Sequence, residues 1–442
     1  MTLFRYLFLI GLLVSHVFSD PLFPHEPTVR VRVINTLDTL NMSLTGGWSL
    51  ETDNAVTTFL DSSSILLIHV NDQIKVMDST GVLTPGNLSF RLKGLSDSSY
   101  ALIKSVPYGV GWWWAGIEDR IYEGALHIYV DSDKAMSVTV ELPLETYLKG
   151  VVPYEIGPTS PLEALKAQAV AARSEAIIAL TSQLYNGEQH DLTSDVECQV
   201  FSGNKRRSMA SDQAVDETRG LILSENGQAM NAYYASNCGG RNELINNVWP
   251  GRTQLASYKV SLPDNVTRKG PRLSKNWKAK RWIKASPTVF CNPELEPALP
   301  GWSKKNFRWE RKFNLAELTK MLSGDQDLGV FKKIKVMARG ESGRIFKARL
   351  VFTNGSFTID GELALRQLFS PSLRSSNFYL KKRGDTVTFY GAGWGHGVGM
   401  CQSGAIAQAS HGAGFEELLK HYYTRAVLLN IYGKPNVETK TP

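Results

Sequence analysis

A single carboxylate, Glu155, stands directly before a long stretch of helical character. It follows Val151-Val152-Pro153 and precedes the loop formers Gly157 and Pro158, so we expect a tight loop to hold it. A carboxyl group held just ahead of a rigid element is well placed to act as a general acid or base. The plainer interpretation is a solvated surface glutamate.

A second candidate centre is the glycine-rich stretch GAGWGHGVGMCQSGA, residues 391–405. Five glycines flank Trp394 and His396, which leaves the backbone free to approach a ligand closely. The stretch lacks the Lys-Ser/Thr ending of a phosphate loop and the second, helically spaced histidine of a zincin. The alternative is a glycine-rich turn whose histidine is satisfied within the core.

The cysteines are Cys198, Cys238, Cys291 and Cys401. Four cysteines allow three full pairings, and the sequence does not choose among them. No CxxC occurs, so spacing does not indicate a structural zinc site. We expect a disulfide or free thiols, with Cys401 buried rather than reactive.

Three stretches of this chain resemble one known family. They are GVVPYEIGPTSPLEALKAQAVAARSEA, YYASNCGGRNE (233–243) and the glycine-rich stretch. The family is the stage II sporulation protein D family, which also contains the LytB amidase enhancers. The resemblance covers residues 120–250 and 345–435 and leaves the first hundred residues uncovered.

The resemblance implies an exported enzyme that acts on bacterial peptidoglycan, a lytic transglycosylase that cleaves glycan strands already stripped of their stem peptides. The family's catalytic glutamate falls in a VVP-x-E motif, which is intact here and ends at Glu155. The residues predicted to bind or orient glycan are Arg173, Tyr233, Ser236, Trp394, His396 and Gln402.

The prediction for Arg173 and the prediction of no cofactor each have an alternative. Arg173 would anchor a carboxylate or the Glu155 loop, although a lone arginine is often a surface charge. No cofactor is expected, but some family members carry zinc near the position of Cys198, so Cys198, Cys238 and His190 form an alternative zinc site.

The implied reaction needs only one carboxyl group. It protonates the glycosidic oxygen and then accepts the proton of the C6 hydroxyl, which closes a 1,6-anhydro ring, so no second carboxylate has to activate water. Glu155 must therefore start protonated, and burial against Tyr154 and Ile156 would raise its pKa. The N-terminus of the following helix would act in the opposite direction.

Two rival functions stay open. One is a non-catalytic wall-binding module that assists an N-acetylmuramoyl-L-alanine amidase, as the enhancer branch implies; retention of Glu155 favours the enzyme. The other is a Cys238–His396 hydrolase acting on wall peptides, which requires the two side chains to be adjacent.

The element that positions Glu155 is a helix predicted over residues 161–184. Ser160 is expected to cap it in a capping box with Glu163, with Pro161 at its first position. Its buried stripe is predicted at helical spacing, at Leu165, Ala169, Ala172 and Ala176.

The fold class predicted is α+β, with mixed and antiparallel sheets around this helix and a β-rich domain in front. The domains expected are a signal peptide (1–19), the β-rich domain (20–118) and a catalytic domain (119–435) with a basic insertion at 252–312. Strands are predicted at 28–34, 64–70, 73–78, 88–94 and 125–131, and short helices at 314–324 and 415–423. Residues 297–312 read as irregular.

Two aromatic-rich stretches have open roles. Trp112, Trp113 and Trp114 form either a sugar-stacking platform or interface packing, and we favour packing. Residues 268–284 hold eight Lys or Arg, with two tryptophans interleaved, and form either a groove for an anionic polymer or a solvated surface.

Composition and the N-terminus bound the location. The 442 residues carry a net charge of +7, which suits an acidic polymer, and both nucleic acid and wall glycan qualify. Residues 1–19 read as a secretory signal, with Arg5 before the apolar run Tyr6 to Val14. We therefore predict an exported, periplasmic or wall-associated protein with no nucleic-acid partner, and membrane contact only through an uncleaved signal segment.

Overall fold

The structure, a computed structural model, describes residues 21–433 except 53–55, 60–62, 83–85, 113, 253–256 and 258–260. Helices alternate with antiparallel and mixed sheets, which confirms the predicted α+β class. The predicted signal, residues 1–19, lies outside the described residues. Within the described part, no helix combines the length and apolar character needed to cross a membrane.

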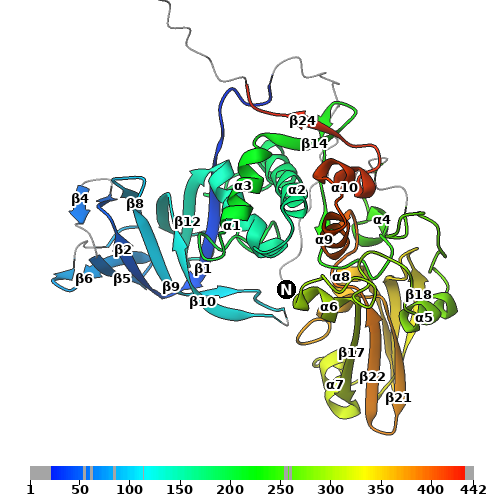
Figure 1. Cartoon of the computed structure of the whole chain (residues 1–442). Helices are drawn as coiled ribbons and strands as arrows, with labels where there is room; N and C mark the ends of the chain where they lie inside the picture. The colour runs from blue at the N-terminus through cyan, green and yellow to red at the C-terminus, as the bar shows by residue number, and fades with distance from the viewer. Residues whose placement is uncertain are drawn as a thin grey trace, which may run out of the picture.

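Two sheets form the N-terminal part, drawn in blue and cyan in Figure 1. The first has the order β13 (Leu192–Thr193), β1 (Thr28–Leu37), β12 (Met136–Pro143), β11 (Ala125–Val130), β8 (Ser89–Gly94), β3 (Trp48–Glu51) and β4 (Val56–Phe59). The second has the order β10 (Gly116–Tyr122), β9 (Tyr100–Tyr108), β2 (Thr39–Thr45), β5 (Ser63–Val70), β6 (Gln73–Asp78) and β7 (Gly81–Val82). The five predicted strands are all present.

The two sheets share one hydrophobic core. Alternate residues of β2, Leu40, Met42 and Leu44, are buried, as expected for a strand with one face covered. They belong to the same core cluster as Val29 and Val138 of the first sheet. The predicted domain boundary at 118/119 falls inside β10, so strands from both sides of it contribute to this core.

Helix α1 (Leu144–Glu155) replaces the loop that was predicted around Glu155. The pair Val151-Val152 and Pro153 argued against a helix, but tertiary burial overrides propensity, since eight of its residues are buried. Glu155 is therefore the last residue of a helix rather than a loop residue. The next helix begins seven residues later.

Helix α2 (Leu162–Thr181) starts one residue later and ends three residues earlier than predicted. The capping box is wrong: the Ser160 hydroxyl donates to the carbonyl of Ile156 at 2.7 Å, at the end of α1, and Pro161 occupies the N-cap. Glu163 instead accepts the backbone N–H of Phe415 at 2.8 Å.

Helix α2 lies at the centre of the molecule, between the N-terminal sheets and α9 and α10 (Figure 1). The predicted stripe, Leu165, Ala169, Ala172 and Ala176, is fully buried in the core shared with the sheets, which confirms it. The opposite face is also buried, in a second core cluster, through Ala167, Val170 and Ala171. A helix that is apolar on both faces must be enclosed by neighbours.

The elements around the second cluster come from distant parts of the chain. They are β14 (Leu221–Glu225), β15 (Gln228–Ala229), β16 (Tyr234–Ala235), α4 (Ile245–Val248), β23 (Met400–Cys401), α9 (Gln402–Ser410), α10 (Phe415–Tyr422) and β24 (Val427–Asn430). Helix α3 (Met209–Glu217) instead packs on α1 and α2, with Ala214 and Val215 in the first core cluster. Helix α10 confirms the prediction at 415–423.

A third core cluster organises the yellow and orange lobe of Figure 1. Its elements are α5 (Asn276–Lys284), α6 (Gly301–Phe307), β17 (Arg308–Asn314), α7 (Leu315–Ser323), β18 (Phe331–Arg339), β19 (Ile345–Phe352), β20 (Ser356–Asp360), α8 (Glu362–Gln367), β21 (Phe378–Arg383) and β22 (Thr386–Ala392). The prediction of an irregular segment at 297–312 is wrong, because α6 and most of β17 lie there. Helix α7 confirms the prediction at 314–324.

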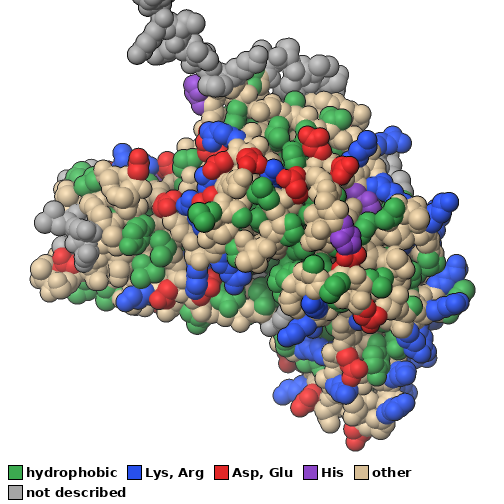
Figure 2. All heavy atoms as spheres, in the orientation of Figure 1, with side chains coloured by type: hydrophobic (Ala, Val, Ile, Leu, Met, Phe, Trp, Pro, Cys, Tyr) green, Lys and Arg blue, Asp and Glu red, His purple; other side chains and the backbone are tan. Residues whose placement is uncertain are grey.

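Lys and Arg side chains gather over this lobe in Figure 2. The basic stretch 268–284 ends in α5, which is anchored by buried Ala279 and Ile283 and by Trp282. The Trp282 indole N–H donates to the carbonyl of Gly239 at 2.9 Å, whereas Trp277 is exposed. One of the two interleaved tryptophans is thus a packing residue.

The prediction of Arg173 as a substrate-binding residue is wrong. Arg173 is fully buried on α2 and forms a bidentate ion pair with Glu145 of α1, at 2.9 and 2.6 Å. Tyr432 and the backbone N–H of Gly220 also donate to Glu145. Arg173 anchors a carboxylate, one of the roles considered for it, and the pair fixes α1 against α2.

Replacing Arg173 by Met should lower the free energy of unfolding by about 3–5 kcal/mol, because Glu145 would stay buried without its cation. The exposed pair between Lys134 and Asp72, 2.9 Å apart, supplies the control. Lys134→Met should cost less than about 1 kcal/mol in urea unfolding. Unchanged stability of the Arg173 variant would contradict a structural role.

Candidate active site

The Glu155 carboxyl group sits at the end of α1 and is partly buried. Its Oε1 accepts the backbone N–H of Val200 at 2.9 Å. Burial raises the pKa of Glu155 to about 7, and hydrogen bonds from Val200, Gln402 and Tyr234 only partly oppose that rise. The C-terminal end of a helix also disfavours a negative charge. The carboxyl group can therefore hold or release a proton near neutral pH.

Two glutamines connect this carboxyl group to α2. Gln402, which hydrogen-bonds Glu155, donates its amide to Gln168 Oε1 at 3.1 Å. Tyr234 donates its hydroxyl to Gln199 Oε1 at 2.8 Å, and Gln199 donates to the carbonyl of Ala172 at 3.1 Å. The polar partners of Glu155 are thus themselves held by the central helix, which restricts their rotamers.

A short parallel pairing brings the second and third sequence motifs together. Tyr234 of β16 pairs with Met400 of β23, and Ala235 pairs with Cys401. Gly399 has a φ of +72°, and a Cβ there would clash with the carbonyl oxygen of Tyr233. Glycine is therefore required for this close approach. Gln402 begins α9 immediately after β23, which is how it reaches Glu155.

An aromatic group lies beside this pairing. The rings of Tyr233 and Trp249 are 4.8 Å apart, and the ring of Trp249 is 4.9 Å from that of His396. The exposed guanidinium of Arg252 lies 4.9 Å from the Trp249 ring and donates to the Tyr233 hydroxyl at 2.6 Å. Aromatic faces next to a cation can bind an anionic sugar through stacking and charge.

His396 is a neutral, oriented side chain. Its Nδ1 accepts the N–H of Val398 at 3.1 Å, and its other ring nitrogen donates to the backbone of Tyr234. Burial and the cations of Arg344 and Arg366 lower its pKa to about 3. It therefore cannot supply a proton as an imidazolium at neutral pH.

Trp394 connects the site to the N-terminal sheets. Its ring meets that of Trp114 edge-on at 5.3 Å, and Trp114 stacks on Trp112 at 4.9 Å. These two tryptophans lie at the turn between β9 and β10, so they form the interface packing that we favoured. Trp113 lies outside the described residues.

Ser236 follows β16 and is held by its neighbours. Its hydroxyl accepts the amide of Asn306 at 3.2 Å, and its carbonyl accepts the Ser403 hydroxyl at 2.7 Å. The structure therefore places Glu155, Tyr233, Ser236, Trp394, His396 and Gln402 around the β16–β23 pairing, and Arg173 away from them in its ion pair. The roles of the six in binding and catalysis stay predictions.

Glu175 was missed from the sequence. It lies on α2, accepts the backbone N–H of Ala232 and the amide of Asn231, and its pKa is raised to about 7, chiefly by burial. Tyr234 lies close enough to interact with both Glu155 and Glu175. A glutamate among the buried alanines of a central helix is the signal that could have found it.

The alternative zinc set is not brought together. Cys198 Sγ accepts the N–H of Thr193 at 3.5 Å and lies 3.6 Å from the Tyr185 hydroxyl. Cys238 lies with Cys291 and Cys401 instead, and all four thiols are free. Spacing in the sequence could not reveal this grouping, because it depends on loops from three segments.

Two parts of the chain match known families. Residues 132–224 match the SpoIID family, described as Stage II sporulation protein, and include α1, Glu155 and α2. Residues 297–399 match a domain of unknown function, DUF8618, which includes Trp394 and His396.

Of three curated relatives, the two whose names state a role agree with the first match. An uncharacterized protein of Brachyspira hyodysenteriae is 29% identical over 323 residues, 73% of this chain and 75% of the relative. Stage II sporulation protein D of Bacillus subtilis is 28% identical over 297 residues, 64% of this chain and 73% of its own length. The Bacillus subtilis amidase enhancer is 28% identical over 296 residues, 64% of this chain but 40% of its own length. These likenesses support a role related to the cell wall and the envelope.

The stability contributed by Glu155 and Glu175 should fall as pH rises from 5 to 8. The pKa values of Glu155 and Glu175, about 7 in the folded chain, lie above the ordinary 4.5, so the folded state binds more protons than the unfolded state in this range. Each group contributes at most about 1.4 kcal/mol per pH unit, less where water reaches it. In thermal melts, the Tm of Glu155→Gln/Glu175→Gln relative to that of the parent should therefore rise with pH over this range.

Glu416 of α10 is exposed and supplies the matched control. Glu416→Gln should follow the parent over the whole pH range. If the double variant keeps the parent's pH dependence, the two carboxyl groups are not the source of it.

Proposed function

The chain belongs to the stage II sporulation protein D family, and from this premise we propose that it is an exported peptidoglycan lytic transglycosylase. Its substrate would be glycan strands already stripped of stem peptides, and its products would carry 1,6-anhydro-muramyl ends. The observation that carries the proposal is a partly exposed glutamate, Glu155, with a pKa of about 7 in the matched family region.

The single carboxyl group accounts for both proton transfers. Protonated Glu155 gives its proton to the glycosidic oxygen as the bond to the anomeric carbon breaks. The resulting carboxylate takes the proton of the C6 hydroxyl of the same muramyl sugar, whose oxygen bonds to the anomeric carbon. Glu155 ends protonated, ready for the next cycle, and no water is consumed. Gln402 steadies Glu155 by a hydrogen bond from its amide.

The aromatic group and Arg252 suit a stripped strand. Removal of a stem peptide leaves a free lactyl carboxylate on each muramyl sugar. Trp249, which is partly exposed and backed by the buried Tyr233, offers a face for a sugar ring, and Arg252 beside it offers a cation for that carboxylate. Intact strands carry a peptide in place of this charge, which would disfavour them at the same subsite.

Two further parts of the proposal rest on resemblance. Export would follow from the signal read at residues 1–19, and an envelope location agrees with the relatives. An amidase that strips the strands would act before this enzyme and is the partner we propose. The rival function, a non-catalytic enhancer of an amidase, is favoured by the likeness to the Bacillus subtilis amidase enhancer.

The mature chain should release anhydro-muramyl products from amidase-stripped strands and little from intact peptidoglycan. Mass spectrometry of the soluble products would identify them by the loss of one water relative to hydrolysis. Glu155→Gln should abolish release, because an amide cannot donate or accept the proton. Glu416→Gln should behave as the parent.

Binding to strands without cleavage, unchanged in Glu155→Gln, would overturn the enzyme and support the enhancer. Products lacking the anhydro ring would instead indicate a hydrolase.

Arg252→Met should raise the KM for stripped strands by about tenfold with little change in kcat, because a contact made equally before and during the reaction is lost. Lys134, an exposed cation of the N-terminal part, gives the control as Lys134→Met. Equal KM values for the Arg252 variant and the parent would remove this arginine from substrate binding.

A further inference from the structure

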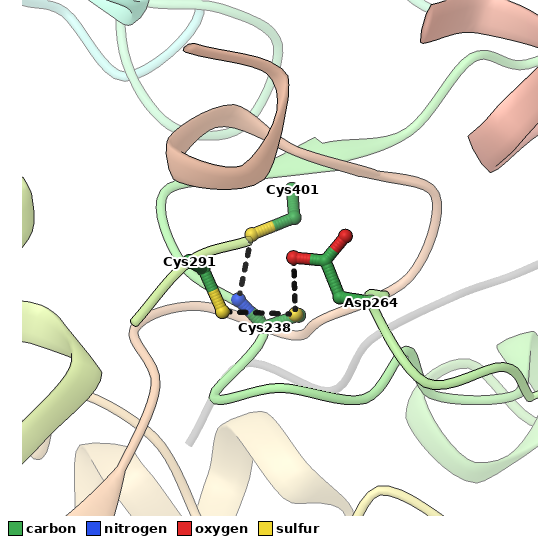
Figure 3. A group of neighbouring side chains, drawn as sticks. All are labelled: Cys238, Asp264, Cys291 and Cys401. Atoms are coloured by element: carbon green, nitrogen blue, oxygen red, sulfur yellow. Dashed lines mark hydrogen bonds between the residues drawn. The ribbon is translucent and has the colours of Figure 1, made fainter. Parts of the chain in front are cut away.

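Three cysteines and one aspartate meet in the interior, next to the site (Figure 3). They come from four separate segments, at Cys238 after β16, Asp264, Cys291 and Cys401 at the end of β23. All four residues are buried, and their ligand atoms lie within 4.8 Å of one another. A search of the described residues for three or more His, Cys, Asp or Glu side chains close enough to share a metal ion gives this group.

The distances fit one tetrahedral ion. With zinc–sulfur bonds of about 2.3 Å, two thiolates at tetrahedral angles lie about 3.8 Å apart, and a thiolate and a carboxylate oxygen about 3.6 Å apart. The Sγ atoms of Cys238 and Cys291 are 3.7 Å apart, and Cys238 Sγ is 3.6 Å from Asp264 Oδ2. A disulfide requires about 2.05 Å between sulfurs, far shorter than this separation.

The surrounding groups orient the four side chains. Asp264 Oδ1 accepts the Tyr422 hydroxyl at 2.9 Å and lies 3.5 Å from His421 Nε2, which turns Oδ2 toward the sulfurs. The backbone N–H of Cys238 donates to Cys401 Sγ at 3.2 Å, and that of Gly240 donates to Cys238 Sγ at 3.3 Å. Such outer contacts are typical of metal centres, where they fix the ligands and favour thiolates.

A partly buried cation stands beside the cluster. The guanidinium of Arg308 lies where the charges of Cys291 and Cys238 act on it, and its hydrogen bonds go to backbone carbonyls such as those of Gly239 and Trp282. Neutral thiols would not balance this charge. Three thiolates and one carboxylate around a divalent ion carry a net charge of −2, which Arg308 partly offsets.

We propose that Cys238, Asp264, Cys291 and Cys401 bind one zinc ion in a closed, structural site. Thiolate ligands select zinc over magnesium or calcium, and four buried protein ligands leave no open position for substrate or water. The site differs from the Cys198, Cys238 and His190 set, from which it retains Cys238 alone.

The ion would hold the candidate active site together. Cys401 precedes Gln402, which hydrogen-bonds Glu155, and Cys238 follows Asn237, which pairs with Trp394. Binding one ion would therefore fix both strands of the β16–β23 pairing, at their C-terminal ends, against the segments at Asp264 and Cys291. This positioning role rests on the proposed function, whereas zinc binding itself does not.

The full chain, purified without chelator, should contain about one zinc per molecule by elemental analysis. Cys291→Ser and Asp264→Asn should each lose most of the bound zinc. Cys198→Ser, which changes a cysteine outside the cluster, should keep it. The parent chain reconstituted with Co²⁺ should show thiolate-to-cobalt charge-transfer bands and intense tetrahedral d–d bands. The cobalt spectrum is measured on the parent chain, so misfolding of Cys291→Ser would not affect it.

The number of free thiols, counted in denaturant without reductant, should be four per chain. The zinc should be released as these thiols react. A parent chain that contains a Cys238–Cys291 disulfide and takes up neither zinc nor cobalt after reduction would overturn the proposal. Full zinc in Cys291→Ser would also overturn it. Metal analysis is independent of glycan cleavage, so a failed transglycosylase assay would leave this result standing.

Discussion

The parallel pairing of β16 with β23 joins residues more than 160 positions apart and holds the candidate site in one place. Tyr234 and Gln402 reach Glu155 only because these two short strands lie side by side. Two residue pairs give little stability on their own, so the pairing depends on what surrounds it. Arg344, buried in the third lobe's β18–β19 hairpin, supports it by donating to the carbonyls of Gly395 and Cys238 at 3.0 and 3.2 Å.

Distant parts of the chain together form the environment of the Glu155 carboxyl group. Burial raises the pKa of Glu155 beside Val200, Tyr234 and Gln402, while the third lobe supplies Arg344 and the scaffold of the glycine-rich stretch. At the β9–β10 turn, Trp114 packs on Trp394 and so links the N-terminal sheets to the glycine-rich stretch. A carboxyl group buried in this way is costly when charged, which is the property a general acid at neutral pH requires.

Regular patterns were read correctly from the sequence, and long-range contacts were not. Alternation gave the N-terminal strands, and alanine spacing gave the buried stripe of α2. Helix α1 was missed because Pro153 and the paired valines oppose helix locally, while burial against α2 stabilises it. Gln168, Trp249 and Arg252 carry no local signal of a site, because their roles come from neighbours far away in the chain. The ion pair of Arg173 is of the same kind.

The central claim is that the fold keeps Glu155 protonated near neutral pH. It is tested most directly by a ¹³C NMR titration of the chain labelled at glutamate side-chain carboxyl carbons. Glu155→Gln assigns the resonance by its loss. The account predicts a midpoint near pH 7 for Glu155. A midpoint near 4.5, the value of an exposed glutamate, would contradict it and remove the basis for its role as the acid.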